Sequence, residues 1–217
     1  EASDLGLCGT VANKGSYVEI HAQGSEKAVE DLKKALESRP PERSVIMEII
    51  SAHADEPPFD SFEIIESEKE KGDIFVSPDI AVCEKCKGEL FDKTNRRYLH
   101  PFINCTQCGP RLTIMDSMPY DRVRTTMADF PMCKDCEDEY TVPATRRYDA
   151  QPVCCNKCGP EVYIIGSEKK GAEAITAARE AVMAGKIIAV KGIGGFHLCC
   201  DAKNEGAVKR LRELKNR

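Results

Sequence analysis

The chain has 217 residues, of which 41% are hydrophobic and 6% are aromatic, so it could form one large domain or two to three small ones with modest cores. Its formal net charge of −5 argues against a polyanion as the main partner, so binding to RNA or DNA is not expected. No run approaches the roughly 20 apolar residues of a membrane span, so no membrane partner is expected either.

Residues 1–66 predict a small α+β unit. Two strands, Leu7–Asn13 and Ser16–Gln23, flank a Lys14-Gly15 turn and predict a hairpin. A helix should begin after the N-cap residue Ser25, because apolar residues then recur at helical spacing. These residues are Ala28, Val29, Leu32, Ala35 and Leu36.

Proline pairs divide the rest of this unit. Pro40-Pro41 should end the helix, and two further strands are predicted at Val45–Ala52 and, after a second proline pair, at Ser61–Glu66. The charged run Ser67–Gly72 predicts a linker over residues 67–78.

Residues 2–13 resemble the acylphosphatase family, which shows the pattern A-x-x-L-G-L-x-G-x-V-x-N from Ala2 to Asn13. The resemblance implies a ferredoxin-like fold and assigns to Asn13 the orientation of the attacking water, which a carboxamide can hold through hydrogen bonds. The residue alone also permits a simpler role, in the hairpin turn.

The family's phosphate-binding loop and its arginine lie upstream of this pattern, outside the chain. We therefore expect no acylphosphatase activity from the chain alone, and robust hydrolysis of benzoyl phosphate would contradict this. The first strand of the family's sheet lies upstream too, so low stability is expected for this unit.

Four Cys-x-x-Cys pairs stand between residues 79 and 165. Each half of this region has the form C-x2-C-x18-C-x2-C, and a shift of fifty residues superposes all eight cysteines. The same shift brings Glu89 onto Glu139 and Arg96-Arg97-Tyr98 onto Arg146-Arg147-Tyr148. The region is therefore a duplicated structural unit, with copies at 79–115 and 129–165.

Two thiolate pairs on tight turns can complete a tetrahedron around zinc, and such a closed site leaves no position for water. We therefore predict two structural zinc ions rather than disulfides or an iron–sulfur cluster, because paired cysteines without a secretory signal favour metal. Two such sites would bring the net charge from −5 to about −9. Pairing within each half is the simplest arrangement, and interleaved pairing stays open. The predicted ligands are Cys83, Cys86, Cys105, Cys108, Cys133, Cys136, Cys155 and Cys158.

Two nearby residues are not counted as ligands. Cys154 has Asn104 as its counterpart in the repeat, and His100 has Ala150. The arginine pairs are interpreted as partners of thiolate charge or as solvated surface residues, in preference to nucleic-acid contacts.

The apolar segments Leu112–Met115 and Val162–Ile165 predict short strands after each last cysteine, so we expect two zinc ribbons with little helix. Gly109 and Gly159, which directly follow the last ligands, should adopt positive φ.

Residues 166–217 change to an α/β pattern. A helix is predicted over Ala172–Ala184, ended by Gly185. A buried strand at Ile187–Val190 should lead through a glycine-rich turn into a second strand that ends near Cys200. A second helix should begin near Asn204, with Ala207, Leu211 and Leu214 on one face.

Glycines let backbone amides approach a phosphate, and Lys191 adds charge, although such a turn is as often only a connection. The turn, the Cys-Asp-Ala ending and the terminal Lys-x-Arg resemble the beginning of a YrdC-type domain. That family forms acyl-adenylates from a nucleoside triphosphate, so the resemblance implies substrate contacts from Lys215 and Arg217. His197 stands where the hydrogenase version of the YrdC-type domain carries a histidine. The alternative role for His197 is that of a packed core side chain.

Three further cysteines in apparent strands are interpreted as packing residues: Cys8, Cys199 and Cys200.

The order of acylphosphatase, two C4 zinc units and YrdC-like segment resembles the HypF family, the carbamoyltransferases of nickel–iron hydrogenase maturation. The overall expectation is thus an α+β multi-domain chain, truncated at both ends and inactive alone. The resemblance implies hydrolysis of carbamoyl phosphate, use of ATP with Mg to form carbamoyl-adenylate, and transfer of the carbamoyl group to the C-terminal cysteine of HypE. It also implies that zinc braces the two catalytic regions and that the enzyme is cytoplasmic.

Two alternatives remain. A zinc-ribbon module that binds nucleic acid or protein would use the arginine pairs, but the acidic charge disfavours it. A threonylcarbamoyl-adenylate synthase shares the YrdC chemistry but does not explain two zinc units.

Overall fold

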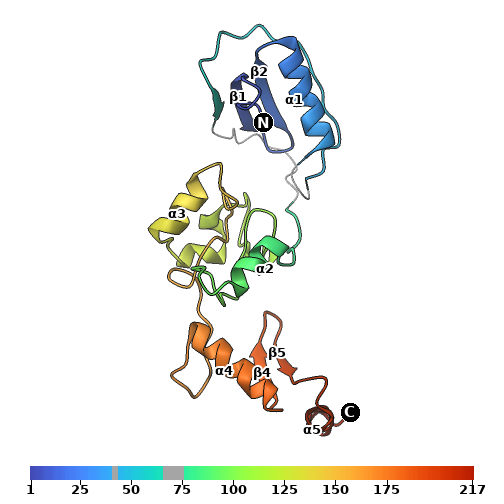
Figure 1. Ribbon diagram of the computed structural model, residues 1–217, viewed down its shortest axis with the longest axis vertical. Helices are drawn as coiled ribbons and strands as arrows, with labels where there is room; N and C mark the ends of the chain where they lie inside the picture. Colours follow the sequence, from blue (N-terminus) through green and yellow to red (C-terminus); the bar gives the residue numbers. More distant parts are fainter. Residues whose placement is uncertain (41–43, 66–75) are drawn as a thin grey trace. The chain divides into compact units, whose positions relative to one another are not determined.

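The computed structural model describes residues 1–40, 44–65 and 76–217, which form the compact units Glu1–Ser77 and Pro78–Arg217. Small sheets alternate with short helices in both units, which confirms the predicted α+β class (Figure 1). Pro41, Glu66 and most of the predicted linker lie outside the described residues. No described helix has the length and apolar character needed to cross a membrane.

The first unit is organised around strand β1, Cys8–Asn13. Strand β2, Val18–Gln23, pairs with it antiparallel, and β3, Phe62–Ile64, pairs with it parallel on the other side. Gly9 has a φ of +146°, and a Cβ there would lie 1.8 Å from the carbonyl oxygen of His21. Only glycine therefore lets β1 approach β2 at this register.

Helix α1, Glu26–Ser38, lies beside this sheet (Figure 1). The Ser25 Oγ accepts a hydrogen bond from the Ala28 amide at 3.2 Å, which confirms the predicted N-cap. Leu32 and Ala35 are buried, whereas Val29 on the predicted apolar face is exposed. The buried face is thus narrower than the apolar spacing alone suggested.

The strand predicted at Val45–Ala52 is wrong. Residues 44–52 have no strand structure, and Val45 and Met47 are largely exposed. A strand is stable only beside a partner that completes its hydrogen bonds. Here β2 and β3 occupy both sides of β1, and no described strand pairs with residues 44–52.

The cysteine region contains more helix than expected. Helices α2, Glu84–Phe91, and α3, Lys134–Thr141, each begin directly after the first cysteine of a repeat. Cys83 and Cys133 are the N-cap residues, so the first Cys-x-x-Cys turn also starts a helix. Cysteine is not among the usual N-cap residues, so the sequence carries no start signal for these helices.

The two short strands predicted after the last cysteines are also wrong. Leu112–Ile114 is a single 3₁₀ turn, η1, and within 162–165 only Tyr163 forms an isolated bridge, with Lys170. Two more 3₁₀ turns follow η1: η2, Arg122–Arg124, and η3, Thr126–Asp129. Apolar runs of this length become strands only where a ladder partner is available.

The last segment contains helix α4, Gly171–Met183, the antiparallel strands β4, Ile188–Lys191, and β5, Phe196–Cys199, and helix α5, Glu205–Lys215. Asn204 caps α5 by accepting from the Ala207 amide at 3.0 Å. β4 is not buried as predicted, since Val190 is 47% exposed. The described sheet has two strands here, which is too few to bury a central strand.

Candidate metal centres

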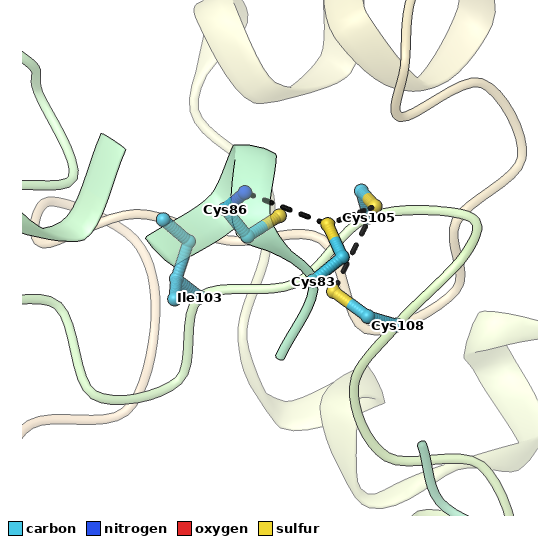
Figure 2. Packing of buried hydrophobic residues seen from close by; sticks show 5 residues of the cluster. All are labelled: Cys83, Cys86, Ile103, Cys105 and Cys108. Carbon is cyan, nitrogen blue, oxygen red and sulfur yellow. Dashed lines mark hydrogen bonds between the residues drawn. The ribbon is translucent and has the colours of Figure 1, made fainter. Parts of the chain in front are cut away.

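The eight cysteines of the repeats form two groups of four, each from one repeat. Within a group all four sulfurs lie within 4.8 Å of one another, and the closest pairs are 3.6 to 3.8 Å apart (Figure 2). Four sulfurs about 2.3 Å from a central zinc would be about 3.8 Å apart along each edge of the tetrahedron. A disulfide needs about 2.05 Å, so the geometry suits a metal ion and not cystine.

The backbone brings the four sulfurs of the first group together from two turns. Cys83 and Cys86 lie at the start of α2, where the Cys83 Sγ accepts from the Cys86 amide at 3.5 Å. Cys105 and Cys108 form a tight turn closed by hydrogen bonds between their backbones. Ile80 and Gly109 exchange two backbone hydrogen bonds beside it and hold this turn against the start of the region.

The two glycines after the last cysteines differ. Gly109 has a φ of +104°, as predicted, and a Cβ there would lie 2.5 Å from the Asn104 Cβ. Gly159 does not have positive φ, so that half of the prediction is wrong; a Cβ would instead lie 2.8 Å from the Cys154 Sγ. Glycine is required at both positions for space, and only at the first for backbone conformation.

The two groups differ in exposure. All four cysteines of the first group are buried, whereas Cys133 and Cys158 in the second are half-buried. A cavity of about 450 Å³ borders the second group and is lined in part by Phe130, Met132 and Lys157. Solvent and chelators therefore have easier access to the second group.

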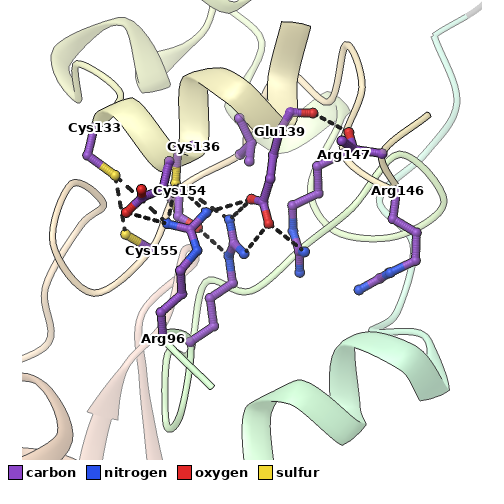
Figure 3. A network of polar contacts seen from close by, with 12 residues as sticks. Arg96, Cys133, Cys136, Glu139, Arg146, Arg147, Cys154 and Cys155 are labelled. Atoms are coloured by element: carbon purple, nitrogen blue, oxygen red, sulfur yellow. Dashed lines mark hydrogen bonds and ion pairs between the residues drawn. The ribbon is translucent and has the colours of Figure 1, made fainter. Parts of the chain in front are cut away.

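The arginines of the first repeat contact the second group. Both terminal nitrogens of Arg96 lie 3.3 Å from the Cys136 Sγ, and Nη2 donates to Glu139 at 2.6 Å (Figure 3). Arg97 donates to the same carboxylate at 2.5 Å and to the backbone carbonyl of Cys154 at 2.8 Å.

The arginines of the second repeat contact the first group in the same way. Arg146 donates to the Cys86 Sγ at 3.4 Å and to Glu89 at 2.6 Å. Arg147 donates to Glu89 and, at 2.9 Å, to the carbonyl of Asn104. The interpretation of the arginine pairs as partners of thiolate charge is confirmed, but each pair contacts the cysteines of the other repeat.

Burial and charge act in opposite directions on these groups. Burial alone would raise the pKa of Glu89 and Glu139, but hydrogen bonds and charge from the arginines hold both below the usual value. Burial alone would lower the pKa of Arg96 and Arg146, but the thiol and carboxylate partners raise it. All four side chains are therefore charged at neutral pH.

Sequence reasoning missed a hydrogen-bonded chain between His100, Cys154 and Asn156. His100 Nε2 lies 3.2 Å from the Cys154 Sγ, and Nδ1 lies 3.0 Å from the Asn156 Oδ1. This is the order found in cysteine hydrolases, but His100 and Cys154 are each only 1% exposed. Burial lowers the pKa of His100 to about 4 and raises that of Cys154 to about 12, so a neutral, packed pair results.

The other predicted site residues lie on hairpins and on a helix end. Asn13 ends β1, and its Oδ1 accepts from the Gly15 amide at 2.9 Å, as expected for the turn role. Lys191 and His197 lie on the β4–β5 hairpin, and both are exposed; the Lys191 Nζ lies 5.7 Å from the Phe196 ring centre. Lys215 and Arg217 lie at the exposed end of α5. Cys8, Cys199 and Cys200 are half-buried, as packing residues can be.

Three known families match successive parts of the chain. The family described as Acylphosphatase matches residues 1–64, and the one described as HypF finger matches residues 82–115 and 132–165. The family described as Telomere recombination, of the Sua5, YciO and YrdC type, matches residues 180–217.

Curated relatives match the chain from end to end. Carbamoyltransferase HypF2 of Cupriavidus necator is 48% identical over 225 residues, and carbamoyltransferase HypF of Synechocystis is 47% identical over 220 residues. Both alignments cover 100% of this chain, which spans only 28% and 29% of the relatives' length.

Two solved structures are also similar. Full-length HypF in a phosphate- and nucleotide-bound form superposes with a TM-score of 0.81 at 42% identity, covering 100% of this chain and 29% of that one. The HypF of T. kodakarensis gives a TM-score of 0.75 at 40% identity, covering 98% and 28%.

Proposed function

This chain belongs to the HypF family, and we propose that it is part of a carbamoyltransferase that acts in nickel–iron hydrogenase maturation. The observation that carries the proposal is the order of its regions: acylphosphatase, duplicated HypF finger and YrdC type follow one another, and relatives named carbamoyltransferase match across all three. Each region alone occurs in other proteins, but the order of all three is specific for this carbamoyltransferase family.

The acylphosphatase region would hydrolyse carbamoyl phosphate to carbamate and phosphate. Asn13 would orient the attacking water. Its Oδ1 is held by the Gly15 amide, which fixes the carboxamide and leaves the Nδ2 group to donate to water. This chain spans under a third of the length of its relatives. Residues that bind the phosphoryl group would come from the rest of the enzyme.

The YrdC-type region would join carbamate to ATP. The carbamate oxygen attacks the α-phosphorus, pyrophosphate leaves, and carbamoyl-adenylate forms. Lys191, Lys215 and Arg217 would contact the phosphates, with Mg sharing their charge, and His197 would contact the substrate. Attack by the C-terminal cysteine thiolate of HypE would then release AMP and leave a thiocarbamate. The similar HypF structure in a phosphate- and nucleotide-bound form supports these two substrate classes.

The two cysteine groups would each hold one structural zinc ion. All four ligands in each group are thiolates from the protein, so no position is left for a reacting water. Bound zinc would supply folding free energy, above all to the first repeat, whose buried cluster consists mainly of ligand cysteines. We propose that the region braces the two catalytic regions. Zinc removal that left both partial reactions and their coupling intact in the complete enzyme would contradict this role.

The alternative of a nucleic-acid-binding zinc module loses its main support. Arg97 and Arg147 are 2% and 4% exposed, and both are occupied by carboxylates and backbone carbonyls. These two side chains cannot reach a phosphate backbone without leaving the half-buried carboxylates of Glu89 and Glu139 without them as partners.

A chimera tests the proposed function. The matching segment of the Synechocystis HypF is replaced by this chain, and the formation of AMP from ATP is measured with carbamoyl phosphate and HypE. We expect AMP formation that depends on carbamoyl phosphate, and carbamoylated HypE detected by mass spectrometry. In the chimera, Asn13→Ala should abolish both, whereas Asn95→Ala, in a finger loop, should not. A folded, zinc-loaded chimera without either product would contradict the proposal.

A further inference from the structure

Each HypF finger repeat supplies the charged groups that hold the other repeat's cysteines. We propose that the two cysteine groups bind and release their metal ions as one cooperative unit. The coupling would run through Arg96, Arg97, Arg146 and Arg147, which act as positioning residues and not as ligands.

The first part of the coupling is direct contact with equivalent ligands. Cys86 and Cys136 occupy the same place in the two repeats, as the second cysteine of the first turn. Cys136 accepts from Arg96 and Arg97 of the other repeat, and Cys86 accepts from Arg146. A metal bound by four thiolates has a net charge of about −2, so these guanidinium groups offset charge at the opposite site.

The second part is a pair of shared carboxylates. Glu89 and Glu139 each follow their ligand cysteine by three residues on the same helix and bind both arginines of the other repeat. Arg147 also lies 3.5 Å from Glu139 of its own repeat, which joins the two networks. The helix that positions a ligand therefore also positions the charge partner of the other repeat.

The third part is backbone docking at the second cysteine turn. The Thr106 Oγ1 donates to the carbonyls of Arg146 and Tyr148, at 3.1 and 2.9 Å. Its counterpart Asn156 donates through Nδ2 to the carbonyls of Arg96 and Tyr98, at 3.4 and 2.9 Å. Each arginine loop is thus fixed to the turn that carries the third and fourth ligands of the other site.

Loss of one metal should therefore weaken the other site. Without metal, the two cysteine turns of a repeat lose the ion that they share, and the helix start and the docking turn become freer to separate. The other repeat's arginine loop then loses its carboxylate and carbonyl partners, and a buried guanidinium without partners is costly. Because linkage is reciprocal, filling either site must favour filling the other by the same factor.

Native mass spectrometry of the metal-free chain titrated with Zn²⁺ tests the proposal without any mutation. Two equal, independent sites leave about half of the chains with one ion at half-saturation, and unequal independent sites leave more. We expect the one-ion form to be clearly below half, with chains carrying mainly no ion or two. A one-ion fraction of half or more would overturn the proposal.

A double variant locates the coupling. Arg96→Gln with Arg146→Gln removes one cross-repeat donor from each site and leaves all eight cysteines. We expect it to bind two ions at saturation, with the one-ion fraction rising toward half. The control is Lys87→Gln with Lys134→Gln, which removes the same charge from two exposed lysines. Among the described residues these lysines pair along their own helices, so the control should titrate like the unmodified chain. An equal one-ion fraction for the two double variants would contradict coupling through the arginines.

A single-site variant keeps the test decisive if the arginine variant does not fold. Cys105→Ser removes a ligand of the first site and leaves the four cysteines of the second unchanged. Release of Zn²⁺ from the second site to an excess of a chromogenic chelator should become at least tenfold faster than from the unmodified chain. An unchanged rate would show that the sites are independent.

Discussion

At the scale of single residues, two positions that differ between the repeats, His100 and Cys154, meet in one buried contact. Their counterparts are Ala150 and Asn104, and the His100 Nε2 lies 3.2 Å from the Cys154 Sγ. The sequence excluded both from the ligand set because they do not repeat, and the structure places both outside the two groups. The contact between His100 and Cys154 could not be predicted from the sequence, because the two residues are 54 positions apart and belong to different repeats.

Protonation of His100 should make stability depend on pH. Burial lowers its pKa to about 4 in the folded chain, against about 6.5 when unfolded, so the unfolded chain binds more protons between these values. The contribution is fully present above pH 6.5 and is lost as the pH falls toward 4. Between pH 6.5 and 5.5, we expect the protonation of His100 in the unfolded chain to lower the unfolding free energy by up to about 1 kcal/mol.

Urea unfolding of the cobalt-loaded chain, followed by the thiolate-to-cobalt absorption, measures this loss. His100→Gln should reduce the pH dependence in this window, and His53→Gln, at an exposed position, should leave it unchanged. Equal slopes for all three proteins would show that His100 does not contribute.

At the scale of elements, local signals predicted the helices and failed for isolated strands. α1 and α5 were predictable because Ser25 and Asn204 cap them and apolar residues recur at helical spacing. Residues 45–52 and 112–115 have strand-like composition, but the first segment has no described strand partner and the second forms only the isolated bridge between Met115 and Thr125. Composition does not reveal whether a partner is present. The eight cysteines followed from spacing alone. The exchange of arginines between repeats did not, because spacing within a repeat says nothing about which repeat a side chain contacts.

The position of Glu89 on α2 predicts that a conservative substitution there will cause a large loss of stability. Glu89→Gln keeps the size of the side chain but removes the charge that faces Arg146 and buried Arg147. We expect a loss of about 2 kcal/mol, because a buried guanidinium loses its ionic partner while part of the site remains solvated. Glu84→Gln on the same helix faces solvent beside Lys87 and should change stability by less than about 0.5 kcal/mol.

Chemical denaturation followed by the cobalt absorption compares the two variants. A Glu89→Gln midpoint equal to that of Glu84→Gln would mean that the cross-repeat ion pairs contribute nothing.

At the scale of the whole molecule, the cysteine region and the acylphosphatase region depend on different stabilising forces. The described cluster of buried apolar residues in the first finger repeat consists of Ile103 and the four ligand cysteines, with few other apolar side chains around it. The sheet β2-β1-β3 instead rests on strand pairing and on Leu32 and Ala35 of α1. The regions should therefore respond differently to metal removal.

Hydrogen exchange of backbone amides with and without a strong zinc chelator tests this difference. We expect amides of α2 and α3 to lose protection when metal is removed, whereas those of β1 and β2 keep theirs. Protection of α2 and α3 that survives chelation would show that metal does not hold these helices.

Metal analysis of the purified chain tests the central claim most directly, namely that the eight cysteines form two structural zinc sites in a member of the HypF family. We predict two zinc ions per chain, with no iron or inorganic sulfide and with all eight ligand thiols protected from alkylation until a chelator is added. Less than one zinc per chain with freely reactive thiols, or iron and sulfide in equal amounts, would contradict it.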